Sequence, residues 1–326
     1  MAEEKKIKTI GVLTSGGDAP GMNAAIRAVV RRAFSKGLTV VGIKKGYAGL
    51  LQEDFYEMHP RDVSDIISRG GTILATARCL EFHDPEVQKQ AADICKKHGI
   101  DGIVVIGGDG SFRGAQALAS HGINTIGVPG TIDLDIACTD YTIGFDTAVN
   151  TAMDAIDKVR DTSTSHERCS IIEVMGRHAG HIAMWCGIAN GAEDILIPEK
   201  YDYVENKIIN HIKENKARGK KHHIIINAEG IGESQSMARR IEAETGMETR
   251  ATILGHMQRG GSPTCKDRVY ASTMGAKAVD LLCEGKSNRV IAHKHGDFID
   301  YDINEALQMK KGVDEYMYEI YRSFSI

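Results

Sequence analysis

The chain has 326 residues and a formal net charge of −4, and charged residues make up 26% of the sequence. This length exceeds what one hydrophobic core usually supports, so we expect a soluble globular protein with two lobes. The acidic balance argues against a nucleic-acid or anionic-membrane partner, because binding to either needs a concentrated basic face.

The N-terminal segment and the cysteines predict a cytoplasmic protein. The first eight residues lack the apolar core of a signal peptide, and no run approaches the roughly eighteen apolar residues of a membrane span. The seven cysteines are scattered and include no Cys-x-x-Cys pair. Neither a disulfide framework nor a thiolate zinc site is therefore indicated.

Apolar segments typical of buried strands alternate with amphipathic helices along the chain. Strands are predicted at 7–13, 38–43, 102–106, 124–128, 170–174 and 222–227. Helices are predicted near 22–36, 61–68, 86–98, 112–120, 147–161, 178–190, 204–218 and 266–284. This alternation predicts an α/β fold with a parallel sheet covered on both faces, and ligands are expected at the carboxyl ends of its strands.

Two strands in the first half run directly into glycine-rich turns. The first leads into Gly16–Gly21 and then a helix, and the strand at 102–106 opens into Gly107–Ser111. Backbone N–H groups in such turns, beside a helix N-terminus, can bind phosphate. A single glycine turn is as readily a tight connection, but the Asp and Ser side chains inside these turns are also ligand types for Mg²⁺.

A third strand, at 124–128, leads into Gly130, Thr131 and the carboxylates Asp133 and Asp135. If this segment is extended, both carboxylates project to the same side of the chain. One could then accept a proton from a sugar hydroxyl while the other holds magnesium, as in phosphoryl transfer. The structural alternative is that the Asp side chains cap a turn.

Arginines in four loops of the second half indicate a phosphorylated substrate. Guanidinium groups bind phosphate through two parallel hydrogen bonds, although any single one is more often part of a surface ion pair. Glu229, at the end of a predicted strand, offers an acceptor for sugar hydroxyls. The basic residues are Arg168, Arg177, Arg250 and Arg259, with His256 near the last of them.

Other nucleotide and metal motifs match poorly. Gly16–Gly21 does not fit Gly-x-Gly-x-x-Gly, and no acidic residue closes a strand about twenty residues later, which disfavours a dinucleotide site. The one Gly-Lys-Ser, at 285–287, follows a helix instead of a strand, so it is not a Walker A loop. His178 and His181 lack a partner carboxylate with zinc-site spacing, which favours a packing or surface role.

With these motifs in place, the chain resembles bacterial ATP-dependent 6-phosphofructokinases over nearly its whole length. The matching segments are 13–25, 106–111, 129–133, 175–177 and 254–263. The resemblance implies two similar three-layer α/β/α lobes with mostly parallel sheets and the active site in the cleft between them. The large ATP-binding lobe would comprise 1–144 plus 258–308, and the smaller sugar-phosphate-binding lobe 145–257 plus 309–326.

The same resemblance implies an allosterically regulated, homotetrameric enzyme of glycolysis that uses Mg²⁺. It would transfer the ATP γ-phosphoryl group to the 1-hydroxyl of fructose 6-phosphate, giving fructose 1,6-bisphosphate and ADP. Asp133 would be the base that takes the hydroxyl proton, assisted by Thr131, Arg78 and Arg177.

Binding residues carry over from the family position by position. The resemblance assigns ATP to Gly17, Tyr47, Arg78, Cys79, Gly108, Asp109, Gly110 and Ser111, and Mg²⁺ to Asp109 and Asp135. It assigns fructose 6-phosphate to Thr131, Ile132, Asp133, Arg168, Met175, Gly176, Arg177, Glu229, Arg250, His256 and Arg259. Of these, Arg168 and Arg250 would reach in from a neighbouring subunit.

Basic residues at helix ends form a further candidate set. Taken alone, they are solvated helix termini that complement the macrodipole. In the family, the matching positions form a second pocket at a subunit interface that binds ADP as activator or phosphoenolpyruvate as inhibitor. They are Arg27, Arg31, Arg160, Gly191, Ala192, Glu193, Arg218, Lys220, Lys221 and His222.

One position departs from the family pattern, and two alternative functions stay open. The family usually reads Thr-Ile-Asp-Asn-Asp, whereas Leu134 occupies the Asn position here. A relative could use diphosphate or phosphorylate another sugar phosphate, but diphosphate-dependent relatives typically carry Asp and Lys where this chain has Gly110 and Gly130. A catalytically dead nucleotide-sensing subunit would be expected to lose acids or arginines from the site, and this chain retains them.

Overall fold

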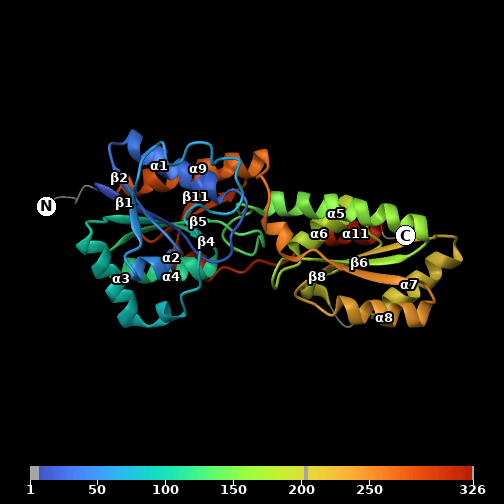
Figure 1. The fold of residues 1–326 in the computed structure, drawn as a ribbon. Coiled ribbons are helices and arrows are strands. Elements are labelled where there is room, and N and C mark those ends of the chain that lie inside the picture. Colours follow the sequence, from blue (N-terminus) through green and yellow to red (C-terminus); the bar gives the residue numbers. More distant parts are fainter. Residues whose placement is uncertain (1–6, 202–204, 325–326) are drawn as a thin grey trace. The chain divides into compact units, whose positions relative to one another are not determined.

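A computed structural model describes residues 7–201 and 205–324 and divides into two compact units (Figure 1). Unit 1 contains the described residues up to Ile132, then Ile136–Thr147 and Arg259–Lys311. Unit 2 contains Asp133–Asp135, Ala148–Gln258 and the C-terminal segment from Gly312. Asp133–Asp135 thus group with unit 2, whereas the division drawn from the sequence placed them in the first lobe.

Unit 1 is built on a seven-stranded sheet with the order β11-β10-β5-β4-β1-β2-β3. The five inner strands pair in parallel, and antiparallel β3 and β11 close the two edges. Helices cover both faces, so central strands β1 and β4 are buried almost throughout. The strands are β1 Thr9–Thr14, β2 Thr39–Ile43, β3 Phe55–Met58, β4 Gly102–Gly107, β5 Asn124–Pro129, β10 Arg289–Lys294 and β11 Asp297–Asp302.

The helices of unit 1 form two layers. Helices α1 and α9 pack together on one face of the sheet, and α2, α3 and α4 lie on the other (Figure 1). On that second face Leu13, Ile103 and Val105 join a core with Phe112 and Leu118 of α4. The bounds are α1 Met22–Ser35, α2 Gly46–Leu51, η1 Leu80–His83, α3 Pro85–Lys97, α4 Asp109–Ser120, α9 Cys265–Cys283 and α10 Ile303–Ala306.

Unit 2 is built on a four-stranded, fully parallel sheet with the order β7-β8-β6-β9. Its strands are β6 Cys169–Val174, β7 Asp194–Leu196, β8 His223–Ala228 and β9 Thr249–Ile253. Helices α7 and α8 bury an isoleucine-rich face against one side, and α5, α6 and α11 lie on the other (Figure 1). The bounds are α5 Phe145–His166, α6 His181–Asn190, η2 Pro198–Lys200, α7 Glu205–Ala217, α8 Ser234–Thr245, η3 Gly255–Arg259 and α11 Glu315–Phe324.

The predicted α/β class is confirmed, and the differences are local. The helix predicted near 61–68 is wrong, because this stretch forms successive turns with hydrogen bonds to the third preceding residue and Asp65 at φ 59°. Helix α4 begins at Asp109 instead of 112, so the predicted phosphate loop is its first turn. The sequence also missed β3, β7, β9, β10, β11, α2, α8, α10 and α11.

The structure also bears on disulfides and membrane spans. All seven cysteines are free. In the part of the chain that the structure describes, no helix combines the length and the apolar character needed to span a membrane.

Candidate active site

The glycine-rich turns after β1 and β4 start side by side at one edge of the unit 1 sheet. The two strands are parallel neighbours, and Thr14 of β1 is paired with Ile106 of β4. The N–H of Ser15 donates to the carbonyl of Ile106 at 3.0 Å. The Ser111 hydroxyl donates to the carbonyl of Ser15, also at 3.0 Å. These hydrogen bonds fix one turn to the other.

The N-terminus of α4 faces open space. Asp109, Gly110 and Ser111 form its first turn, and the extended Gly108 is its N-cap without a side-chain cap. A Cβ added at Gly108 or Gly110 would meet no heavy atom within 4 Å. Because the positive end of a helix dipole favours anions, this turn can bind phosphate oxygens.

Arg259 lies against the first glycine-rich turn. A Cβ at Gly17 would lie 2.5 Å from Nη1 of Arg259, so a larger residue here would require the guanidinium group to move. The Nε of Arg259 is buried and has no hydrogen-bond partner among the described residues. An unpaired buried donor on a charged group is costly, so an anionic ligand would stabilise it. The structure therefore places Arg259, assigned to the sugar phosphate by resemblance, beside the predicted nucleotide turn.

Three more predicted nucleotide residues lie in unit 1. The Tyr47 ring is buried and stacks on Phe82 with centroids 4.3 Å apart, and its hydroxyl donates to the Ser111 carbonyl at 2.6 Å. Burial raises the pKa of Tyr47. These contacts position the start of α4. Arg78 is exposed and Cys79 half-buried in the segment that precedes η1.

The acidic pair follows β5. Thr131 is half-buried and Ile132 buried, and Asp133 is 9% exposed. The segment is not extended, because Leu134 adopts φ 56°. The alternation argument that predicted a shared side for Asp133 and Asp135 therefore does not hold. Asp135 is half-buried.

In unit 2, five of the predicted sugar-phosphate residues lie just beyond the carboxyl ends of the strands. Met175–Arg177 follow β6, Glu229 follows β8, and His256 follows β9. One oxygen of the Glu229 carboxylate accepts the N–H groups of Gly176 at 3.1 Å and Arg177 at 2.6 Å. Arg177 is exposed and holds φ 57°, a strained conformation for a non-glycine residue that is common at functional sites.

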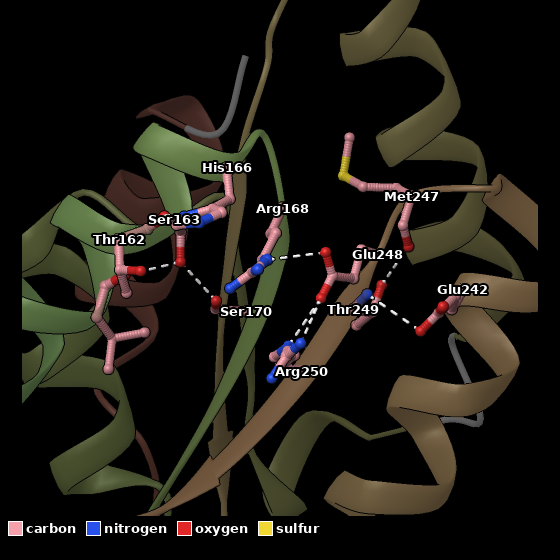
Figure 2. A network of polar contacts seen from close by, with 11 residues as sticks. Thr162, Ser163, His166, Arg168, Ser170, Glu242, Met247, Glu248, Thr249 and Arg250 are labelled. Carbon is pink, nitrogen blue, oxygen red and sulfur yellow. Dashed lines mark hydrogen bonds and ion pairs between the residues drawn. The ribbon is translucent and has the colours of Figure 1, made fainter.

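Arg168 and Arg250 meet at the opposite edge of the same sheet. Arg168 precedes β6 and Arg250 lies near the start of neighbouring β9, and both point toward Glu248 (Figure 2). Nε of Arg168 lies 2.9 Å from one Glu248 oxygen, and Nη2 of Arg250 lies 2.7 Å from the other. Hydrogen bonds from Arg250 and Arg168 lower the pKa of Glu248. The two guanidinium groups thus converge on one anionic group, as they would on a phosphate.

Arg168 and Arg250 lie at the amino ends of the neighbouring strands β6 and β9, whereas Arg177 follows the carboxyl end of β6. The six residues of β6 separate Arg168 from Met175–Arg177. At a rise of about 3.3 Å per residue, this is about 20 Å. One phosphate cannot contact both groups within a single unit 2.

Of the predicted effector residues, Arg27 and Arg31 belong to α1 of unit 1, and the others belong to unit 2. Nζ of Lys220 lies 2.6 Å from the buried Glu193 carboxylate, and Arg160 donates to the carbonyl of Gly191 at 3.4 Å. Burial lowers the pKa of His222, and the nearby Arg160 and Lys220 add to this effect. The structure therefore brings Arg160, Gly191, Glu193, Lys220 and His222 together.

The remaining unit 2 effector residues contribute less to this cluster. Ala192 is buried, Arg218 is exposed, and Lys221 pairs with Glu167 at 2.8 Å.

Sequence reasoning missed two positioning residues in unit 2. Glu248 holds both Arg168 and Arg250, and its place two residues before Arg250 was the available signal. Gln258 is fully buried, and its side-chain oxygen accepts the N–H of Met175 at 2.8 Å. A single amide in the sequence gives no sign of such a role.

Comparisons with known proteins identify relatives along almost the entire chain. The sequence model of the phosphofructokinase family matches residues 9–282. The ATP-dependent 6-phosphofructokinase of Clostridium botulinum (strain Loch Maree / Type A3) is 59% identical over 96% of this chain and 98% of its own length. The protein of the same name from Clostridium novyi (strain NT) is 56% identical over 98% of this chain and 100% of its own length.

Solved structures of phosphofructokinases have the same fold as this chain. Phosphofructokinase from Saccharomyces cerevisiae superposes with a TM-score of 0.85 at 33% identity, covering 97% of this chain. The present chain spans about half of that yeast chain, 46%. A pyrophosphate-dependent phosphofructokinase from Marinobacter aquaeolei, at 21% identity, a TM-score of 0.85 and coverage of 95% of this chain and 86% of its own, shows the fold alone.

Proposed function

The chain belongs to the phosphofructokinase family, and from this premise we propose that it transfers the γ-phosphoryl group of ATP to the 1-hydroxyl of fructose 6-phosphate. The products are fructose 1,6-bisphosphate and ADP, a step of glycolysis. The observation that carries the choice of donor is the open space at Gly108 and Gly110 in front of α4.

ATP binds to the turns of unit 1 in this proposal. Backbone N–H groups at the start of α4 and in the turn that contains Gly17 hold its phosphates, and Arg259 supplies a guanidinium beside that turn. Gly130 also favours ATP over diphosphate. A Cβ at Gly130 would lie 3.0 Å from Ile106 and 3.2 Å from Met22, so the Lys of diphosphate-dependent relatives would have to displace its neighbours.

In this proposal Mg²⁺ binds to Asp109 and Asp135, the carboxylates that the family assigns to it. Asp109 is exposed and Asp135 half-buried, and carboxylate oxygens are the hard ligands that Mg²⁺ prefers. Because Mg²⁺ usually keeps several waters and binds through one or two carboxylates plus substrate phosphates, two Asp residues are a sufficient protein contribution. When bound, the ion neutralises charge on the phosphate oxygens.

Fructose 6-phosphate binds to the carboxyl edge of unit 2. Glu229, held by two backbone N–H groups, accepts sugar hydroxyls, and Arg177 stabilises the transferring phosphoryl group. Asp133 takes the proton of the 1-hydroxyl, whose oxygen forms a bond to the γ-phosphorus as the bond to ADP breaks. Thr131 and Arg78 stabilise the charge that develops on the phosphoryl oxygens.

The active assembly in this proposal is a homotetramer. The two ends of β6 are about 20 Å apart, so a fructose 6-phosphate bound at Met175–Arg177 does not reach Arg168 and Arg250 of the same chain. They would instead bind the 6-phosphate at a neighbouring subunit, replacing the contacts that Glu248 makes with both guanidinium groups.

The cluster around Lys220 is the proposed effector site. Arg160, Lys220 and His222 offer cationic or hydrogen-bonding groups to ADP or phosphoenolpyruvate, together with Arg27 and Arg31 of a neighbouring subunit. Either ligand can act only through different affinities for two states of the tetramer.

The free cysteines are those of a protein kept in a reducing compartment, so we place the enzyme in the cytoplasm.

A coupled assay of the purified chain tests the proposal. With Mg²⁺, we expect turnover with ATP and fructose 6-phosphate, and little with diphosphate or with tagatose 6-phosphate. The dependence of the rate on fructose 6-phosphate should become sigmoidal when phosphoenolpyruvate is present. Addition of ADP should relieve this sigmoidal dependence. Turnover only with diphosphate or tagatose 6-phosphate would instead indicate a relative that uses diphosphate or phosphorylates another sugar phosphate. Nucleotide binding without any turnover would indicate a sensing subunit.

A further inference from the structure

Two imidazoles and one carboxylate of unit 2 converge on a single point. Nε2 of His223 lies 2.6 Å from Oδ2 of Asp194, and Nδ1 of His211 lies 3.2 Å from the same oxygen. The three ligand atoms all lie within 4.8 Å of one another. The imidazole rings are almost perpendicular, at 87°, with centroids 5.3 Å apart.

The sheet register explains why these side chains meet. Asp194 of β7 is paired with Ile225 of β8, and His223 is two residues before Ile225. Because side chains alternate along a strand, Asp194 and His223 project from the same face of the sheet. That face is covered by α7, whose Ile208 and Ile212 are buried in its core. His211, on the same helix, therefore reaches the carboxylate from above.

We propose that Asp194, His211 and His223 bind one divalent transition-metal ion, with Zn²⁺ as the best match. Two neutral imidazoles with one carboxylate form a standard three-ligand zinc set, and nitrogen ligands disfavour Mg²⁺ and Ca²⁺. In a tetrahedral site with bonds of about 2.0–2.1 Å, ligand atoms lie about 3.3 Å apart. His211 and Asp194 already match this separation, and His223 needs a shift of about 0.7 Å.

The surroundings suit a cation and leave the site reachable. His223 is 1% exposed, whereas the side chains of Asp194 and His211 are 15% and 21% exposed. The ion can therefore enter from the His211 side, where water takes the fourth position. Of the neighbouring charged groups, Lys220 is paired with Glu193 at 2.6 Å, so its charge is compensated.

Calorimetric titration of the chelator-treated full chain with ZnCl₂, in excess Mg²⁺, tests the site. We expect one Zn²⁺ per chain bound by this site. His211→Gln removes a ligand nitrogen but keeps a side-chain N–H that can donate to Asp194, so the fold is retained. This variant should weaken Zn²⁺ binding by about 100-fold or more. His166→Ala, which removes an exposed histidine of the same unit, should leave the affinity unchanged.

Cobalt distinguishes this site from the exposed cysteines, Cys265 and Cys283. Co²⁺ bound to two imidazoles and a carboxylate should give visible d–d absorption of a tetrahedral complex without thiolate charge-transfer bands. These d–d bands should be lost in His211→Gln. Absence of stoichiometric Zn²⁺ binding, equal affinity in His211→Gln and wild type, or a thiolate spectrum would each overturn the proposal and leave Asp194 as a hydrogen-bonded partner of two histidines.

Discussion

Gly110 offers a substitution that separates nucleotide binding from stability. In Gly110→Asp the new side chain enters open space, because a Cβ there meets no protein atom within 4 Å. The position lies in the first turn of α4, where an acidic side chain stabilises a helix by about 0.3–1 kcal/mol. The variant should therefore unfold at the same urea concentration as wild type or a slightly higher one.

ATP binding should respond in the opposite direction. A carboxylate about 4 Å from a nucleotide phosphate repels it by about 1 kcal/mol in water and about 4 kcal/mol at the effective dielectric of a protein surface. This corresponds to a loss of affinity between about fivefold and several hundredfold. Gly110→Asn has nearly the same size without the charge, so it separates repulsion from steric hindrance.

Calorimetric titration of ATP into the three proteins measures the effect. We expect the dissociation constant for ATP to be lowest in wild type, higher in Gly110→Asn and highest in Gly110→Asp. Equal ATP affinities in all three would refute the reasoning and show that the start of α4 is only a tight connection between β4 and its helix.

Three further predictions concern other parts of the molecule. Arg168→Ser and Arg250→Ser should each raise KM for fructose 6-phosphate much more than they change kcat, because the two arginines hold a phosphate that does not react. Hybrids of either variant with Asp133→Ser chains should recover activity, and verified mixing without recovery would place the site within one chain. Leu134→Asn should leave kcat/KM unchanged or higher, and a large loss of activity would show that the loop has adapted to leucine. In urea titrations it should lower the unfolding free energy by about 1–2 kcal/mol, because losing the buried leucine side chain outweighs the relief of backbone strain at φ 56°. In wild type the N–H groups of Gly144 and Thr147 donate to the two carboxylate oxygens of Asp267, so in Asp267→Asn one of them must face the amide nitrogen, which cannot accept a hydrogen bond. This should lower the unfolding free energy by about 1–3 kcal/mol, and unchanged stability would mean that the donors find other partners.

The sequence predicted the inner strands of both sheets except β10, because each of them contains a run of apolar residues between turn residues. The edge strands β3 and β11 were missed because mixed polar and apolar residues do not stand out from loops. The helix predicted over 61–68 does not form, and Val63 and Ile66 are instead buried within turns. Local periodicity cannot distinguish these outcomes, because tertiary packing decides between them.

The candidate site shows a similar division. Glycine-rich turns at strand ends were readable, since the position of a turn relative to a strand is local information. The left-handed backbone at Leu134 was not, because leucine seldom adopts it. Nor did spacing indicate that Asp194, His211 and His223 converge, since β7, α7 and β8 meet only through the register of the sheet.

The kcat of Asp133→Ser tests the central claim most directly. Loss of the general base should lower kcat by about 10²- to 10⁴-fold while binding of fructose 6-phosphate is largely kept. Asp140→Ser, which removes an exposed carboxylate seven residues further along the chain, serves as the control and should retain wild-type kcat. If folded Asp133→Ser instead keeps more than about a third of wild-type kcat, Asp133 does not take the hydroxyl proton and the proposed mechanism is contradicted.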